Sequence, residues 1–273
     1  MHVRSDYEFR LVKQDQITSL RKEMYESLSA PLDGMWDELI HRAIIKGIYL
    51  KNTLIGYFCH DHAYTLINFY VSQKWLNRKE LILRNLLTDE YFPQAYVCTN
   101  HPCFLTAALP VARQHTVYYY LFEDCTESRH PVLPPGFEQA KLVLATPRDT
   151  PNIVRFCMQT NEADEAWLSQ YTNYWAQREG MYFLSLDHTI IATCELRLSE
   201  TQPQYADLGA IVSPSYRRQG LGTYLMKKGK AFAYERGRTP ICSCRFDNQG
   251  SRKMIENAGF VNKHVMFKVR FNM

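Results

Sequence analysis

The chain has 273 residues, a length that allows one large domain or two domains of ordinary size. Hydrophobic residues make up 46% of it and charged residues 22%, with a net charge of +4, so the composition is that of a globular protein and excludes a disordered or collagen-like chain. No apolar run approaches the ~18 residues of a membrane helix, and residues 1–10 lack the apolar segment of a signal peptide, so we expect a cytoplasmic protein without a membrane partner.

The first half of the sequence alternates between strand-like and helical patterns. Strands are predicted over Tyr7–Val12, Ile48–Lys51, Leu54–His60, Tyr64–Val71, Ala95–Thr99 and Val117–Phe122. Helices are predicted over residues 15–28, 35–46, Asn77–Thr88 and Pro102–Leu109. Taken in chain order, this half therefore predicts one strand, two helices, three strands, and then a helix, a strand, a helix and a final strand.

A proline-rich stretch follows. Residues 129–137 hold three prolines and a glycine, which break both helices and sheets. We interpret this stretch as a linker between a domain of residues 1–128 and a domain of residues 138–273.

The second half repeats the order of the first. Strands are predicted over Lys141–Ala145, Met181–Leu186, Ile190–Leu198, Tyr205–Val212, Ile241–Phe246 and His264–Phe271. Helices are predicted over residues 150–160, 163–178, 220–235 and Ser251–Ala258. Gly259 suits the left-handed end of the last helix, and His264–Phe271 is expected to close the sheet of this half. The repeated order predicts an α/β chain of two tandem domains, each a mixed, mostly antiparallel sheet flanked by helices.

One loop in the second half carries the features of a phosphate-binding site. Pro214 ends a strand, and Gly220 and Gly222 then lead directly into a helix. Glycines let the backbone approach a ligand, and the start of a helix offers unpaired N–H groups and the positive end of its dipole. Arg217 and Arg218 add fixed charge. Residues 215–245 hold eight basic side chains and one acid, which favours a phosphorylated cofactor first and a nucleic acid second.

Neither of the two best-known phosphate loops fits this segment. A Walker loop requires Gly-x-x-x-x-Gly-Lys-Ser/Thr, which the sequence lacks, and a dinucleotide loop requires a third glycine, where Leu225 stands. The run Arg217-Arg-Gln-Gly-Leu-Gly222 instead resembles the Gln/Arg-x-x-Gly-x-Gly/Ala signature of the GNAT superfamily of N-acetyltransferases, and Val212-Ser-Pro-Ser-Tyr216 resembles its lead-in. The segment from Asn248 to Phe260 resembles the second GNAT signature. These motifs cover residues 138–273, whereas the first half matches only by its order of elements and resembles a degenerate GNAT domain.

The resemblance implies a site for acetyl-CoA as co-substrate, without a metal. Backbone N–H groups of residues 218–223 would hold the pyrophosphate, and the strand ending at Ile211 and Val212 would diverge from strand 241–246, so that pantetheine pairs with its exposed edge. A neutral amine would attack the thioester directly, with a backbone N–H near Val212 stabilising the oxyanion. The implied cofactor-binding residues are Ile211, Val212, Arg217, Arg218, Gln219, Gly220, Leu221, Gly222, Thr223, Asn248 and Ser251.

The candidate catalytic acids are Glu195 and Asp207. An ammonium with a pKa near ~10 must lose its proton before it attacks, and both carboxylates lie on strands expected to line the cleft. The alternative is that either acid faces solvent or pairs with Arg197. Ile255 stands where many members of the superfamily carry the tyrosine that protonates the leaving thiolate, so Tyr224 or Ser251 would have to replace it, or no dedicated acid is used.

The matching junction of the first half, Tyr70–Lys79, contains no glycine, and Trp75 and Leu76 would crowd a phosphate. We therefore expect one CoA site, in residues 138–273, and transfer of an acetyl or short acyl group from the CoA thioester to an amine. A non-catalytic acyl-CoA-binding sensor is the alternative that Ile255 favours, and a nucleic-acid partner is disfavoured. The sequence specifies neither the acceptor amine nor the oligomeric state.

Overall fold

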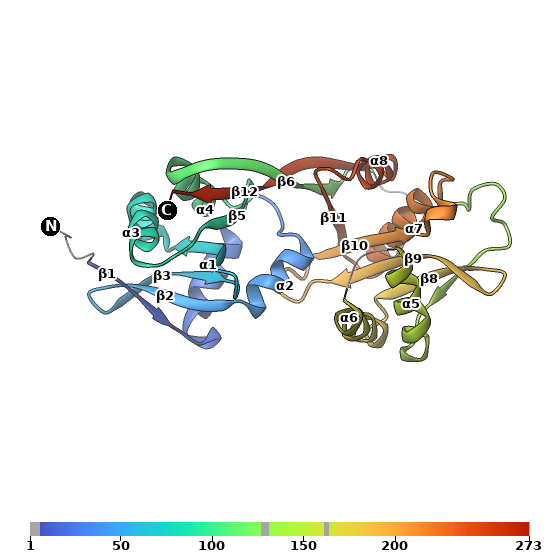
Figure 1. Ribbon diagram of the computed structural model, residues 1–273, viewed down its shortest axis with the longest axis horizontal. Helices are drawn as coiled ribbons and strands as arrows, with labels where there is room; N and C mark the ends of the chain where they lie inside the picture. The colour runs from blue at the N-terminus through green and yellow to red at the C-terminus, as the bar shows by residue number, and fades with distance from the viewer. Residues whose placement is uncertain (1–5, 127–130, 161–163, 273) are drawn as a thin grey trace. The chain divides into compact units, whose positions relative to one another are not determined.

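The computed structural model describes residues 6–126, 131–160 and 164–272. The chain folds into two compact units, and neither unit is continuous in sequence (Figure 1). The N-terminal unit comprises residues up to 120 together with 245–247 and the chain from 264 onward. The C-terminal unit comprises residues 121–244 and 248–263.

The N-terminal unit follows the predicted order of elements. Its strands are β1 (Tyr7–Leu11), β2 (Ile44–Leu50), β3 (Thr53–His60), β4 (Thr65–Val71), β5 (Gln94–Cys98) and the first nine residues of β6 (Ala112–Asp124). Its helices are α1 (Thr18–Glu26), α2 (Gly34–Arg42), α3 (Lys79–Asp89) and α4 (Pro102–Ala108). Neighbouring strands from β1 to β4 pair antiparallel, and β4 pairs parallel with β5.

The C-terminal unit repeats this pattern. Its strands are β7 (Lys141–Leu144), β8 (Met181–Leu186), β9 (Thr189–Leu198), β10 (Tyr205–Val212), β11 (Thr239–Arg245) and the start of β12 (Phe260–Phe271). Its helices are α5 (Thr150–Thr160), α6 (Glu165–Gln177), α7 (Leu221–Glu235) and α8 (Gln249–Asn257). Strands β7 to β10 pair antiparallel, and β10 pairs parallel with β11. The predicted repeat, the α/β class and the mixed, mostly antiparallel sheets are confirmed.

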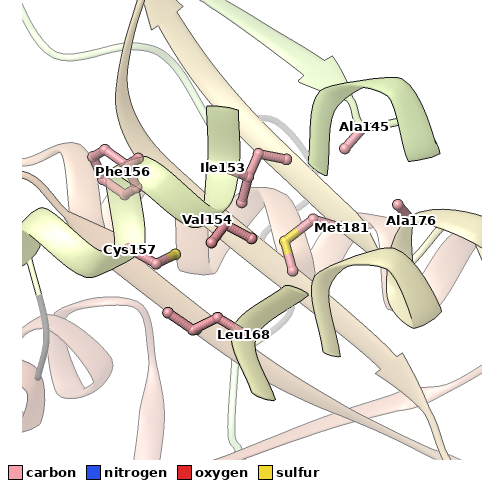
Figure 2. Packing of buried hydrophobic residues seen from close by; sticks show 8 residues of the cluster. All are labelled: Ala145, Ile153, Val154, Phe156, Cys157, Leu168, Ala176 and Met181. Carbon is pink, nitrogen blue, oxygen red and sulfur yellow. The ribbon is translucent and has the colours of Figure 1, made fainter. Parts of the chain in front are cut away.

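Helices cover both faces of the C-terminal sheet. Helix α7 packs on one face, where Gly229 brings it close: a Cβ there would lie 3.2 Å from Leu208 and 3.4 Å from Cys194. The other face carries α5 and α6, whose apolar residues form a core with Met181 of β8 (Figure 2). The members of that core are Ala145, Ile153, Val154, Phe156, Cys157, Leu168, Ala176 and Met181.

Two predicted elements are wrong in ways that have physical causes. The helix expected over residues 35–46 ends at Arg42, because Ile44 and Ile45 are β-branched and pair with His60 and Cys59 of β3. The last strand begins at Phe260 rather than His264. Its later part pairs with β5 from Met266↔Cys98 to Arg270↔Gln94. These residues therefore complete the sheet of the N-terminal unit and do not close the C-terminal one.

The end of β6 belongs to the C-terminal unit because a buried ion pair holds it there. Lys230 of α7 is fully buried and lies 2.5 Å from the carboxylate of Asp124. The same ammonium donates to the carbonyl oxygens of Thr126 and Ala258. Three acceptors around one buried ammonium satisfy its charge and fix this segment against α7.

All eight cysteines are free thiols, and seven of them are buried and pack as small apolar residues. No helix in the described part of the chain combines the length and apolarity needed to cross a membrane. The described residues also contain no cluster of three His, Cys, Asp or Glu side chains arranged to hold a metal ion.

Candidate active site

The centre of the candidate site is the point where β10 and β11 diverge. Their parallel pairing joins three residue pairs and ends at Asp207↔Ile241. Within the described chain, β10 continues to Val212 without a register partner on that side. The predicted divergence of these two strands is therefore confirmed.

The unpaired edge of β10 presents backbone groups to this opening. On its other side β10 pairs with β9 as far as Val212↔Ala192, and Ser213 N–H donates to the Ile191 carbonyl at 3.0 Å. Because N–H groups alternate in direction along an antiparallel strand, those of Leu208, Ala210 and Val212 point away from β9. The last four residues of β10 are only partly buried. The edge is therefore able to accept an extended ligand as an added strand.

The loop after β10 turns sharply into α7. Pro214–Tyr216 form a short 3-10 turn, and Arg218 and Gly220 have positive φ angles of 63° and 88°. The first intrahelical hydrogen bond of α7 runs from Tyr224 N–H to the Gly220 carbonyl at 3.0 Å. The N–H groups of Leu221, Gly222 and Thr223 precede it and have no intrahelical acceptor. They lie at the positive end of the helix dipole, where an anion is favoured.

Close packing against α8 requires a glycine at position 222. A Cβ on Gly222 would lie 2.4 Å from Met254 Sδ of α8 and 3.6 Å from Val212. The Thr223 hydroxyl donates to the Met254 carbonyl at 3.5 Å. These contacts hold α8, through Met254, against the start of α7.

The basic side chains of the loop differ in their contacts. Arg217 Nε donates to the Val212 carbonyl at 3.0 Å, so this side chain braces the edge of β10. Gln219 Nε2 donates to the Ser215 carbonyl at 3.2 Å. Arg218 is exposed, and none of the described carboxylates forms an ion pair with it. Arg218 is thus the loop cation best able to meet a phosphate.

Part of the proline-rich stretch packs on this loop. Phe137 contacts Tyr216 edge to face, with ring centroids 6.1 Å apart. A Cβ on Gly220 would lie 3.1 Å from Pro134. The segment predicted to be a linker therefore flanks the loop in the C-terminal unit; of the predicted linker, residues 129 and 130 lie outside the described residues.

The residues of the second signature lie at the start of α8. The Asn248 side chain accepts a hydrogen bond from Ser251 N–H at 3.0 Å and caps the helix. Ile255 is buried, with 2% of its surface exposed, and offers no proton donor. Burial raises the pKa of Cys244 to about 11, so its thiol stays protonated and is a poor nucleophile.

Both candidate acids pair with Arg197, as the alternative interpretation anticipated. Arg197 Nη1 lies 3.0 Å from Glu195 Oε2, and Arg197 Nη2 lies 3.0 Å from Asp207 Oδ2. Asp207 is 1% exposed, whereas Glu195 is 13% exposed. A Cβ on Gly209 would lie 3.1 Å from Glu195 Oε2, so this carboxylate lies over β10. Glu195 is the more accessible of the two acids.

Sequence reasoning missed Tyr171 of α6. Its hydroxyl donates to Glu195 Oε2 at 2.6 Å and accepts from Arg197 Nη1 at 2.9 Å. Burial is the main cause that raises the pKa of Tyr171 well above its ordinary value, and it therefore remains a hydrogen-bond donor. Trp167, Tyr171 and Trp175 recur at helical spacing, a pattern that resembles an apolar core stripe and hides the polar role of the middle residue.

The matching junction in the N-terminal unit is filled. Strand β4 pairs with β5 at only two positions, Thr65↔Gln94 and Leu66↔Ala95, so these strands also diverge. All seven residues of β4 are buried. Phe104 of α4 packs against Phe69, with ring centroids 6.0 Å apart.

A side chain of this unit also occupies a backbone N–H group in the loop after β4. Ser72 N–H donates to the Ile55 carbonyl at 2.9 Å, which directs Val71 N–H to the opposite side of β4. The Cys103 thiol of α4 lies beside the backbone of Val71. In the loop that follows, Gln73 N–H donates to Glu23 Oε1 at 2.7 Å. One N–H group of this loop is therefore already hydrogen-bonded to a carboxylate of the protein.

Comparison with known proteins supports the interpretation of both halves. Residues 13–125 match the model of the acetyltransferase (GNAT) domain, and residues 150–260 match that of the acetyltransferase (GNAT) family. No curated protein matches the chain.

Solved structures resemble the chain over its whole length. An acetyltransferase of the GNAT family from Colwellia psychrerythraea is 24% identical with a TM-score of 0.87, and the match covers 97% of this chain and 100% of that one. A tandem GNAT protein from the clavulanic acid biosynthesis pathway, solved without AcCoA, is 14% identical with a TM-score of 0.62, over 98% and 99% of the two chains. At these identities the likeness concerns the fold. With a GNAT model matching each half, the chain belongs to the GNAT family of acetyltransferases and contains two GNAT domains.

Proposed function

We propose that the C-terminal unit binds acetyl-CoA and transfers its acetyl group, or another short acyl group, to an amine. The observation that carries this proposal is the open edge of β10 beside a glycine-containing loop that leads into α7. An extended ligand that ends in a pyrophosphate has the two features that this surface complements. Acetyl-CoA supplies an activated acyl group as a thioester.

The loop would hold the phosphates through its backbone. The N–H groups of residues 218–223 lie at the start of α7, and Arg218 is exposed beside them. The fit of the loop depends on Gly222, because a Cβ there would collide with Met254. Pantetheine would lie along β10 near Ile211 and Val212, with Asn248 and Ser251 on the other side of the opening.

The residues near the end of β10 would assist the transfer. Val212 N–H points into the opening and would donate to the oxyanion that forms when an amine attacks a thioester carbonyl. Glu195 would accept the proton of the amine directly or through water, held in place by Tyr171 and Arg197. Asp207 would act through Arg197, since its ion pair is almost fully buried.

A transfer assay tests this function. The purified chain is incubated with acetyl-CoA and a panel of small amines, amino acids, aminoglycosides and lysine peptides, and products are identified by mass. We expect an acetylated amine and stoichiometric release of CoA. Saturable CoA binding without turnover of any amine would instead indicate an acyl-CoA-binding module, and no CoA binding would refute both.

A further inference from the structure

An open groove lies between α5 and α6 in the C-terminal unit. Its volume is about 860 Å³, which is within the range of pockets that hold small molecules. Its described lining residues belong to α5, to α6 or to the short turn that precedes α5, and none of them is a residue of the candidate active site. We refer to this cavity as the α5–α6 groove.

The floor of the groove is held by the core of the unit. Val154 of α5 lines the groove and is 4% exposed. It belongs to the same core as Leu168 of α6, and Figure 2 shows both side chains in that core. The floor is therefore fixed by packing and does not depend on a ligand.

One end of the groove is mainly apolar. Pro147 and Pro151 line it, one in the turn before α5 and one at the start of the helix. Thr150 lines the same end, but its hydroxyl is inaccessible to solvent and therefore does not face the groove. With Val154 as the floor, this end suits an apolar side chain.

The other end carries one positive and one negative side chain, Arg155 and Glu165. Because α5 ends at Thr160 and α6 begins at Glu165, the end of α5 lies beside the start of α6. Both charged side chains are exposed, and within the described residues neither forms an ion pair. Gln159 and Ser169 add an amide and a hydroxyl to this end. Its chemistry matches a ligand that carries both charges.

The spacing of the two ends along α5 suits a single amino acid. Pro151 and Arg155 are four residues apart, and four residues of an α-helix rise by about 6 Å. An aromatic side chain spans a similar length from its α-carbon to the far edge of its ring. One molecule can therefore reach both ends of the groove.

We propose that the α5–α6 groove binds a free α-amino acid with a large apolar side chain. Its carboxylate accepts hydrogen bonds from Arg155, and its ammonium pairs with Glu165. Its side chain lies over Val154 beside the two prolines, where it removes apolar surface from water. This site does not depend on acetyl-CoA binding or on acetyl transfer.

L-phenylalanine is the probe for this site. Saturation-transfer NMR of its ring protons, with the whole chain and without acetyl-CoA, should show saturable binding. The analogue 3-phenylpropanoate lacks the ammonium and phenylalaninamide lacks the carboxylate, and each should bind at least ~10-fold more weakly. Free glycine lacks the side chain and should not compete.

Arg155→Met tests the charged end, and because Arg155 is exposed the fold should be kept. Phenylalanine binding should fall at least ~10-fold. Arg148→Met is the matched control, since Arg148 is exposed, carries the same charge and lies in the turn before α5, but is not among the described residues that line the groove. It should bind phenylalanine as the unmodified chain does.

Three results would overturn the proposal: no saturable binding of phenylalanine, an analogue that binds as tightly as phenylalanine, or normal binding by Arg155→Met. Glu195→Gln identifies a different binding position. Binding that is lost in Glu195→Gln and kept in Arg155→Met would place phenylalanine at the proposed acceptor position, and that result also contradicts the proposal.

Discussion

The two strand-to-helix junctions of this chain share a backbone plan and differ in what fills it. In both, a parallel strand pair separates after two or three residue pairs, and the serine after the strand donates to the preceding antiparallel strand. In the N-terminal unit β4 is buried throughout, whereas the last four residues of β10 are partly exposed. A ligand site in this fold therefore depends on the side chains that leave the opening free, not on the strand geometry alone.

The difference extends to individual backbone groups. The Cys103 thiol lies beside the backbone of Val71, while in the described chain the pairing of β10 with β11 ends at Asp207, five residues before Val212. Gln73 N–H is taken by Glu23, while the loop before α7 bends through Gly220 and leaves its N–H groups at a helix start. Protein atoms thus occupy the N-terminal junction. We therefore expect a structural role for the N-terminal junction and a binding role for the C-terminal one.

Removing the side chain that fills the first opening should have the largest effect on stability. Phe104 is 1% exposed, so Phe104→Ala deletes a buried ring and should lower the free energy of unfolding by about 3–5 kcal/mol. Met254 contacts the second junction but is partly exposed, and Met254→Ala should cost about 1 kcal/mol. Urea unfolding of both variants measures the difference. Equal losses would show that the two openings are filled alike.

Blocking the second opening should abolish CoA binding. Gly220 has a φ of 88° and lies at the start of α7, so Gly220→Trp strains the loop and places an indole beside the proposed phosphate position. We expect at least a ~100-fold rise in Kd, equivalent to about 2.7 kcal/mol. Gly237→Trp is the control, because Gly237 also has a positive φ, 66°, but has open space around it. Unchanged affinity in a folded Gly220→Trp variant would refute the assignment of this loop.

The same titration counts the sites. Calorimetry of the whole chain should give one equivalent of CoA, and none after Gly220→Trp. Phe104→Ala should still give one, because Glu23 continues to occupy the Gln73 N–H of the first junction. A second equivalent of similar affinity would show that the N-terminal unit has kept a cofactor site.

The proposed base should have an intermediate effect. Glu195→Gln keeps the shape of the side chain and removes its charge, and we expect a ~10–100-fold loss of kcat/KM that is greatest at low pH, where more of the amine is protonated. Burial raises the pKa of Tyr171, so its titration does not contribute near neutral pH. Tyr171→Phe should lower activity less, because it only removes a hydrogen bond that positions Glu195. Normal pH profiles in Glu195→Gln, Asp207→Asn and the double variant would exclude both acids.

The sequence was sufficient to predict the order of elements and the loop before α7. It was insufficient where two paired strands lie far apart in the chain. Periodicity located β8 to within its observed bounds, and the glycines of the loop marked the start of α7. The partner of the last strand was not predictable, because pairing of Met266 with Cys98 is decided by tertiary contacts that leave no local pattern. The ion pair of Glu195 with Arg197 was foreseen as an alternative, since these residues are two positions apart on one strand and therefore lie on the same face.

The smallest effect is expected at Arg217, and it separates two roles for the loop arginines. Arg217 Nε bonds to the Val212 carbonyl, so part of its contribution is to hold the edge of β10. Arg217→Gln should weaken CoA binding by about 3–10-fold, through loss of this bond and of one charge near the phosphates. Salt distinguishes the two arginines, because screening weakens a charge contact more than a hydrogen bond within the loop. As the salt concentration rises, the CoA affinity of Arg218→Gln should approach that of the unmodified chain. The affinity of Arg217→Gln should approach it less. Equal salt dependence of the two variants would show that Arg217 acts only through its charge.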